Sequence, residues 1–597
     1  MCRIHRIPDT SRPKLVSPPV NSNTCSAWAS RLLRREGLLP GSGKKAAKPG
    51  SAKASLVYTS VYLQTLELNI IRVDLSRSHC IQAVTPRPQK LSRDSLNPSF
   101  LSSQTAVLNI HDHIMPLILD LPAAVFVCVN VILLVAFLSR HFHRPSGTPV
   151  VSWAFPIIGH ALPFVLAPTQ FLAWCRARTG PVFKLILPGQ NMVVVSDPMA
   201  IVFLQTRSQK ELGPFDYQAI GPLSGIPDAR VPAIFHVLHH KVYTLAASSL
   251  SSKNLGDLAA DTVGRAIAAL KSISMDTQSL VDINMSDLVS RVLFRASSAT
   301  FWGEQMPDVL TDFLAFDRDM FFIAGRIPFG GRSGVQARER LVLVMRTFLA
   351  ECWSDDENAC LRGASPFMSN TIRALKQSNL SDDEVARTLI VLLWGFHSNV
   401  IQVSVWLMAY LTANPYAFIK VRDGVRAVYP DAEPDVDVLS RHFREVPILD
   451  SAIKEVMRMT LLPTSARVAL ADVVLPSEDG CTHTVRKGER IIVDVRGLHH
   501  DPRYHKNPTS FQADRFLDSE ARYGNHGGLK TLVPWGGGMF MCKGREYAQR
   551  VIKAYFIIFF QLYDVGLWGY QLPSHDNWSA SVAHPNSCPP VRLRRRE

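Results

Sequence analysis

The feature that most limits the fold of this 597-residue chain is one long helical pattern beyond its middle. Ser381 and Glu384 have the capping-box spacing that begins a helix, and Asn414 with Pro415 ends it. About 32 residues at a rise of 1.5 Å each span about 48 Å, enough to cross a whole domain. Only a few short strand-like runs occur, such as 192–197 and 489–495. We therefore expect one large domain, mainly α with small β-sheets.

The basic charge of the chain is concentrated at one end. The formal net charge is +15, and residues 1–100 hold 16 Lys and Arg against 5 Asp and Glu, which accounts for +11 of it. The main domain therefore lacks the basic balance of a nucleic-acid binder, and no nucleic-acid partner is expected. The 10 cysteines include no Cys-x-x-Cys pair, which favours a reducing compartment and argues against a zinc ribbon.

Residues 1–114 form a basic extension rich in Ser, Pro and Arg, a composition typical of disorder. An organelle transit peptide has the same composition. Residues 121–138 are uncharged and come close to the length of a membrane span, so we expect a transmembrane anchor within 115–139. A buried core helix or a signal-peptide core would also fit this stretch.

The flanks of this span predict its orientation. Arg140 and Arg144 follow it, which places the downstream side in the cytosol. A basic extension upstream would oppose that orientation, so we expect Met115 to be the working start and residues 1–114 to be absent from the mature protein. Four prolines then make 140–163 a stiff hinge, and 164–597 form the main domain.

Polar residues interrupt the apolar middle of the long helix. Gly395, Ser398, Asn399 and Gln402 recur at helical spacing and line one face. This face either packs on a polar neighbour or lines a groove in which Gly395 gives room and Ser398 and Asn399 give hydrogen bonds. His397 lies off the face and is expected to be structural.

A second motif places two charges in apolar surroundings. Glu455 and Arg458 are three residues apart on a helix that Pro447 can begin. Such a pair is usually a solvated surface contact, but the neighbouring Val456, Met457 and Met459 make a buried pair plausible. Arg515 is a second arginine that could reach the same carboxylate.

A third motif surrounds one cysteine near the C-terminus. Gly536, Gly537 and Gly538 precede Cys542, and a helical pattern begins after Gly544. Glycines permit close approaches that a β-carbon forbids. A helix N-terminus favours the thiolate that a metal ligand must be, and a buried structural cysteine is the alternative.

Together these motifs resemble the cytochrome P-450 superfamily of haem-thiolate monooxygenases, from roughly Arg144 to the C-terminus. The helix segment from Trp394 to Asn399 is similar to the branch that holds sterol 7α- and 12α-hydroxylases, prostacyclin synthase and many fungal enzymes. The haem loop of the superfamily matches Trp535, Gly536, Gly538, Cys542 and Gly544. Its buried E-x-x-R motif matches Glu455 and Arg458. Its P-x-x-F-x-x-x-R-F motif matches Pro508, Phe511, Arg515 and Phe516.

The resemblance implies a P-450 fold and a haem b whose iron takes the Cys542 thiolate as axial ligand. It implies that Glu455, Arg458 and Arg515 form a network that supports the haem core, and that Arg467 pairs with a haem propionate. His239, His240 and Lys241 are further candidates for the propionates. The three glycines before Cys542 would let the loop lie flat against the porphyrin.

Two positions depart from the pattern of the superfamily. Ser398 and Asn399 stand where most members have an acid–alcohol pair that relays protons, so protons must arrive through water or the substrate. Phe540 replaces the basic residue two positions before the cysteine.

The expected function is oxidation of a lipophilic terpenoid, sterol or other secondary metabolite with dioxygen. The side chains of Trp394, Phe396 and Val400 would make the groove largely apolar. Electrons would come from NADPH through cytochrome P-450 reductase, and membrane lipid would hold the anchor in the endoplasmic reticulum, with the haem domain in the cytosol. A haem-thiolate isomerase or dehydratase, or a haem-binding membrane protein without turnover, stays open. The reductase would dock on basic residues near the cysteine, namely Lys543, Arg545, Arg550 and Lys553.

Overall fold

The structure is a computed structural model, and all the residues it describes belong to the part of the chain from Ser99 to Glu597. The expected extension 1–114 and, apart from Cys128 and Val131, the expected span 115–139 lie outside the described residues. The described residues are 128, 131, 147–152, 154–155, 158–207, 210–214, 216–273, 280–327, 330–353, 363–463, 466–518, 525–526, 529–538, 541–566, 570–574, 579, 581–586, 588 and 590–596.

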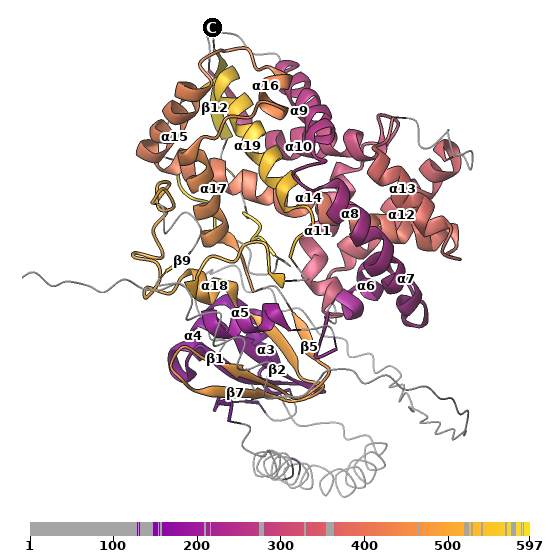
Figure 1. Ribbon diagram of the computed structural model, residues 1–597, viewed down its shortest axis with the longest axis vertical. Coiled ribbons are helices and arrows are strands. Elements are labelled where there is room, and N and C mark those ends of the chain that lie inside the picture. Colours follow the sequence, from indigo (N-terminus) through magenta and orange to yellow (C-terminus); the bar gives the residue numbers. More distant parts are fainter. Residues whose placement is uncertain are drawn as a thin grey trace, which may run out of the picture. The chain divides into compact units, whose positions relative to one another are not determined.

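Helices dominate this part of the chain (Figure 1). Those before the long helix are α3 Ala161–Leu166, α4 Pro168–Thr179, α5 Pro198–Thr206, α6 Asp216–Ser224, α7 Val231–Val237, the π-helix η3 Leu238–Val242, α8 Tyr243–Ser249, α9 Gly256–Lys271, α10 Met285–Trp302, α11 Leu310–Ala324, α12 Arg332–Cys352 and α13 Pro366–Lys376. The long helix and those after it are α14 Asp382–Ala413, α15 Pro415–Val428, α16 Val436–Ser440, α17 Pro447–Thr460, α18 Val495–His499 and α19 Arg545–Leu562.

The sheets are small, as expected. The largest has five strands in the order β1-β2-β8-β5-β3, in which β2 and β8 are parallel and the other neighbours antiparallel. Figure 1 shows this sheet with α4 and α5 at one end of the helical part. Its strands are β1 Val182–Leu187, β2 Gln190–Val195, β8 Arg490–Val493, β5 Arg467–Ala469 and β3 Leu212–Pro214; the smaller sheets are formed by β11 Tyr563–Gly566, β12 Pro590–Arg595 and β4 Val281–Asn284, by β6 Val473–Pro476 and β7 Thr482–Val485, and by β9 Asn525–His526 and β10 Leu529–Lys530.

The long helix α14 is the central element. Its capping box is formed, with the Ser381 side chain accepting from the Glu384 backbone and the Glu384 side chain accepting from the Ser381 backbone. It contacts α6, α10, α11, α12, α13, α15, α17 and α19. Among the described helices, α14 alone is long and apolar enough by length and composition to cross a membrane, but 67% of its most apolar window is buried inside the protein, as in a core helix.

The segment expected to be a hinge is partly docked on the sheet. Lys184 of β1 donates to the carbonyl oxygen of Pro149 (2.8 Å), and the backbone of Val151 donates to that of Lys184 (3.1 Å). Pro163 lies inside α3. The described part of 140–163 therefore belongs to the packed domain.

Candidate functional site

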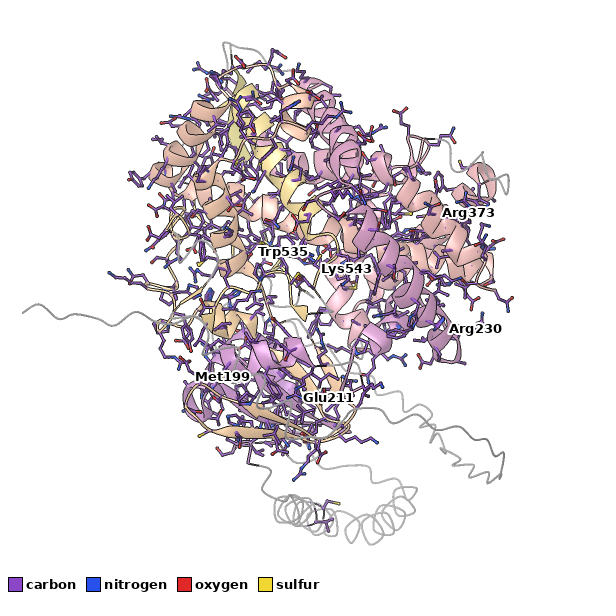
Figure 2. The ribbon with its side chains drawn as sticks, in the orientation of Figure 1. Met199, Glu211, Arg230, Arg373, Trp535 and Lys543 are labelled. Atoms are coloured by element: carbon purple, nitrogen blue, oxygen red, sulfur yellow. The ribbon has the colours of Figure 1, made fainter. Side chains whose placement is uncertain are left out.

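The loop before Cys542 is a tight turn between β10 and α19. The backbone N–H of Cys542 donates to the carbonyl oxygen of Trp535 (2.9 Å), which closes the turn. Gly536 and Gly538 have φ of +68° and +60°, in the left-handed region that favours glycine. Figure 2 labels Trp535 and Lys543, which lie on either side of this turn. Phe540, which replaces the usual basic residue, lies outside the described residues.

Gly537 and Gly538 of this loop pack against helix α5. A β-carbon on Gly538 would lie 1.9 Å from the backbone oxygen of Gln205 in α5, and one on Gly537 would lie 2.2 Å from the Gln205 side-chain oxygen. We expected these glycines to make room for a porphyrin. At Gly537 and Gly538 the structure gives a different reason, because the loop packs on α5 there. A run of glycines in the sequence is equally compatible with contact to a porphyrin and with contact to a helix.

Cys542 is exposed as a residue, but neighbouring protein atoms desolvate its sulfur. Tyr547 and Ala548, one turn further along α19, are buried. Burial raises the pKa of the Cys542 thiol, and the hydrogen bond from Gly544 and the charges of Arg545 and Lys543 only partly offset this. The thiolate expected from the helix N-terminus is thus not favoured by the protein alone. A bound metal ion would supply what is lacking, since it deprotonates a coordinating thiol.

Two more residues of the predicted haem site lie beside the loop. Arg467 on β5 and Gly536 line one small cavity together with Gln205 and apolar side chains. Arg467 donates to the carbonyl oxygen of Ala466 (2.7 Å). Gly544 is the N-cap of α19, and a β-carbon there would lie 4.0 Å from the Cys542 sulfur.

The residues proposed as further propionate partners lie in η3. The His239 ring stacks on Phe235 with centroids 4.0 Å apart, and the His240 ring lies 4.5 Å from that of His236. Lys241 donates to the Ser378 hydroxyl (3.0 Å). These contacts do not connect the three residues with the cysteine loop.

The Glu455 network forms as predicted. Glu455 and Arg458 are both fully buried, and two hydrogen bonds of 2.7 and 2.9 Å join them. Arg515 Nε donates to Glu455 Oε2 (2.9 Å). Arg458 also donates to the carbonyl oxygens of His499 and Pro508 (2.7 and 2.8 Å). The Arg458 guanidinium and Arg515 Nε therefore have hydrogen-bond acceptors, as a buried ion pair requires.

The polar face of α14 divides into two parts. Gly395 is exposed, with no heavy atom within 4 Å of a β-carbon built there, although it lies in a mostly buried helix. Asn399, one turn on, is half-buried, and its Oδ1 has no hydrogen-bond partner among the described residues. Ser398 and Gln402 are instead buried against α11. The Ser398 and Gln402 side therefore packs on a polar neighbour, although Ser398 was expected to offer its hydrogen bond to a groove. The groove at Gly395 and Asn399 stays a prediction.

The residue that holds the buried side is Asp317 of α11, which sequence reasoning did not identify. Its Oδ1 accepts from Ser398 Oγ (2.6 Å) and Trp394 Nε1 (2.8 Å). Its Oδ2 accepts from His584 Nε2 (3.0 Å) and Gln402 Nε2 (3.4 Å). An acid between Phe313, Phe316 and Met320 on one apolar face was the available signal, whereas nothing in the sequence marks His584.

Electrostatics keep the Asp317 carboxyl ionised. Burial would raise its pKa, but His584 and the hydrogen bonds from Ser398 and Trp394 outweigh this and hold the pKa below its ordinary value. His397 is structural, as expected, and is tied to Ser298 (3.2 Å) and to the Leu393 carbonyl oxygen (2.8 Å).

One expected groove residue points elsewhere. The Phe396 ring stacks on Phe301 at 4.3 Å and meets Phe367 edge-on at 5.8 Å. It follows Gly395 by one residue, which is about 100° around a helix, so it faces the packed core rather than the open side. Trp394 uses its indole N–H on Asp317, and Val400 is buried.

The comparisons with known proteins agree with this architecture. The family model for Cytochrome P450 matches residues 149–588. The chain belongs to the cytochrome P450 family. Prostacyclin synthase of Bos taurus is 25% identical over 478 residues, covering 76% of this chain and 94% of that protein.

Two further relatives are a hydroxylase and a protein that carries the family name. The 7-alpha-hydroxycholest-4-en-3-one 12-alpha-hydroxylase of Oryctolagus cuniculus is 24% identical, covering 72% of this chain and 92% of that protein. Cytochrome P450 7A1 of Rattus norvegicus is 25% identical, covering 71% and 88%. A solved structure, the retinoic acid bound cyanobacterial CYP120A1, matches with a TM-score of 0.58 at 19% identity, covering 75% of this chain and 99% of that one, and supports the fold.

The cofactor of a P450 enzyme is haem held by a thiolate, and the residue types of this site suit it. The chain offers an exposed thiol at a tight turn, an arginine in the adjoining cavity and an open face on the central helix. The unpartnered Asn399 Oδ1 is a further polar group that needs a ligand or water.

Proposed function

We propose that this chain is a membrane-anchored P450 monooxygenase that oxidises a lipophilic substrate with dioxygen and electrons from NADPH. The observation that carries the proposal is the open stretch of α14 at Gly395 and Asn399, in a helix that is otherwise packed in the core. Within the described part of the chain, an exposed, uncontacted glycine next to a buried, unpartnered amide oxygen is a position that suits a ligand. The family supplies haem as the cofactor beside it.

Each residue of the site then has a defined task. Cys542 Sγ would hold the haem iron, and the bound metal would keep this sulfur ionised against the effect of burial. Arg467 would pair with a haem propionate. The thiolate-ligated haem supplies oxygen activation when bound. Asn399 would hold water or a substrate oxygen, because an amide both donates and accepts but cannot ionise.

The substrate class follows from the surroundings and from the relatives. The largely apolar composition of α14 suits a hydrophobic molecule, and Asn399 would add one polar contact. We propose a sterol, terpenoid or similar secondary metabolite, in keeping with the similarity to a sterol 12α-hydroxylase.

Rearrangement without external electrons is the second candidate. Its support is the similarity to prostacyclin synthase, together with Asn399 in place of an ionisable residue. The two are separated by incubating the haem-loaded protein and reductase with a lipophilic substrate panel, with and without NADPH and dioxygen. The monooxygenase proposal expects product only with both. Product from a peroxide substrate without NADPH would favour the isomerase.

We also propose that the span 115–139 anchors the protein in the endoplasmic reticulum and that cytochrome P450 reductase docks near Cys542. Acidic neighbours partly offset the positive charge of the proposed docking residues. Arg545 pairs with Glu546 (3.2 Å), and Lys553 pairs with both Glu445 (3.0 Å) and Asp450 (2.9 Å). A modest decrease of the reduction rate with added salt is therefore expected.

A further inference from the structure

The Asp317 cluster lies beside the open part of α14 and joins three separate elements. Asp317 comes from α11, Ser398 from α14 and His584 from the segment before β12. Among the described residues, no lysine or arginine pairs with this carboxylate; its one ionisable partner is His584, at 3.0 Å. A buried carboxylate without a permanent counter-charge is costly, so its presence needs a reason.

Direct binding of substrate by Asp317 does not fit the geometry. The two carboxylate oxygens already accept four hydrogen bonds, from Trp394 and Ser398 on Oδ1 and from His584 and Gln402 on Oδ2. A carboxylate has about four acceptor positions. Asp317 is therefore saturated and can act on the groove only through its neighbours.

We propose that Asp317 and His584 supply the ionisable group that the groove face of α14 lacks, and that they exchange protons with the groove through Ser398. This inference rests on the proposed monooxygenase function, which requires proton delivery. Asp317 is then a positioning residue, since its link to α14 is the 2.6 Å hydrogen bond from Ser398 Oγ. Ser398 is adjacent to Asn399 and three residues from Gly395, the two open positions of the helix.

The transfer moves one proton and no electrons. For delivery, the ionised Asp317 carboxylate first takes the Nε2 proton of His584 and becomes the neutral acid. The acid then gives its proton to Ser398 Oγ as Ser398 releases its own hydroxyl proton to water or a substrate oxygen, which leaves the carboxylate ionised again. The links are 3.0 Å and 2.6 Å long. The His584 side chain is 11% exposed against 3% for Asp317, so the proton enters at His584.

The same chain works in reverse, which allows a test without turnover. Hydrogen cyanide is protonated at neutral pH and must lose its proton when it binds the ferric haem-loaded protein. An ionised Asp317 receives that proton through Ser398. We expect Asp317→Asn to slow cyanide binding about a hundredfold, the low end of general-base effects, and Asp317→Glu to restore part of the rate.

Asp197→Asn is the matched control. Asp197 is also a buried aspartate with several donors, from Ala200 N (2.9 Å), Ser477 Oγ (2.9 Å) and Glu478 N (3.0 Å), but it caps α5. It should bind cyanide at the wild-type rate. Ser398→Ala is the second variant; it removes only the exit of the relay and should slow cyanide binding like Asp317→Asn, even if the latter folds poorly.

Turnover provides the second readout. With the carbon monoxide spectrum intact, Asp317→Asn should yield less product per NADPH and a larger solvent isotope effect than the wild type. Wild-type cyanide binding and coupling in both Asp317→Asn and Ser398→Ala would overturn the inference. If the wild type shows no NADPH-dependent turnover, the proposed function fails, while the cyanide result still decides the role of Asp317.

Discussion

Two buried carboxylates in this molecule, Glu455 and Asp317, are neutralised in different ways. Glu455 lies between two arginines, Arg458 and Arg515, at 2.7 and 2.9 Å. Asp317 has three neutral donors and one histidine, which carries charge only when protonated. The first arrangement is permanent, because arginine does not titrate in proteins. The second depends on the protonation of a histidine, and it is the carboxylate for which we propose proton exchange.

The largest expected effect comes from breaking the permanent network. Arg458→Ala leaves the Glu455 charge buried with only Arg515, and should lower the free energy of unfolding by about 3–5 kcal/mol and give haem-poor protein. Arg503→Ala, which removes the exposed arginine of a pair with Asp501 (2.8 Å), is the control and should cost about 1 kcal/mol or less. Normal haem content and stability in Arg458→Ala would remove the distinction between the two carboxylates.

A smaller loss is expected at the second carboxylate. Asp317→Asn keeps one acceptor oxygen but places an amide N–H₂ among groups that donate, so the free energy of unfolding should fall by about 1–3 kcal/mol. Denaturant unfolding of the haem-loaded protein measures this. A loss as large as that in Arg458→Ala would show that the Asp317 cluster is equally structural.

The pH dependence of this difference sharpens the comparison. Because the folded protein holds the pKa of Asp317 below its ordinary value, the ionised carboxylate stabilises the fold above about pH 4. The stability gap between wild type and Asp317→Asn should be constant near neutral pH and should shrink as the pH falls below about 4. A gap that grows on acidification would contradict the assigned direction.

The smallest effects are expected from single donors to Asp317. Trp394→Phe removes a 2.8 Å hydrogen bond and should cost about 1 kcal/mol, while Gln402→Leu removes a 3.4 Å one and should cost less. Thermal unfolding of the two variants side by side gives the order. The reverse order would mean that the indole N–H contributes little to holding the carboxylate.

Local spacing was enough to predict the elements and the Glu455–Arg458 pair. The capping box fixed the start of α14, and the i, i+3 spacing placed Glu455 and Arg458 together on α17. Arg515 required long-range information, which the resemblance to P-450 enzymes supplied.

The Asp317 cluster could not be predicted in the same way. Asp317 and His584 are 267 residues apart, and only tertiary packing brings them together. The pairing of Gly537 and Gly538 with Gln205 and the turn of Phe396 into the core also depend on neighbouring elements. The raised pKa of Cys542 follows from burial, which the helix N-terminus alone did not reveal.

The central claim is that Cys542 ligates haem iron as a thiolate. The reduced carbon monoxide difference spectrum of the haem-loaded protein tests it most directly, with Cys481→Ser as control because Cys481 is an exposed cysteine in the turn between β6 and β7. The wild type and Cys481→Ser should both show the thiolate-type band, and Cys542→Ser should lose it. A thiolate-type band that persists in Cys542→Ser would contradict the account.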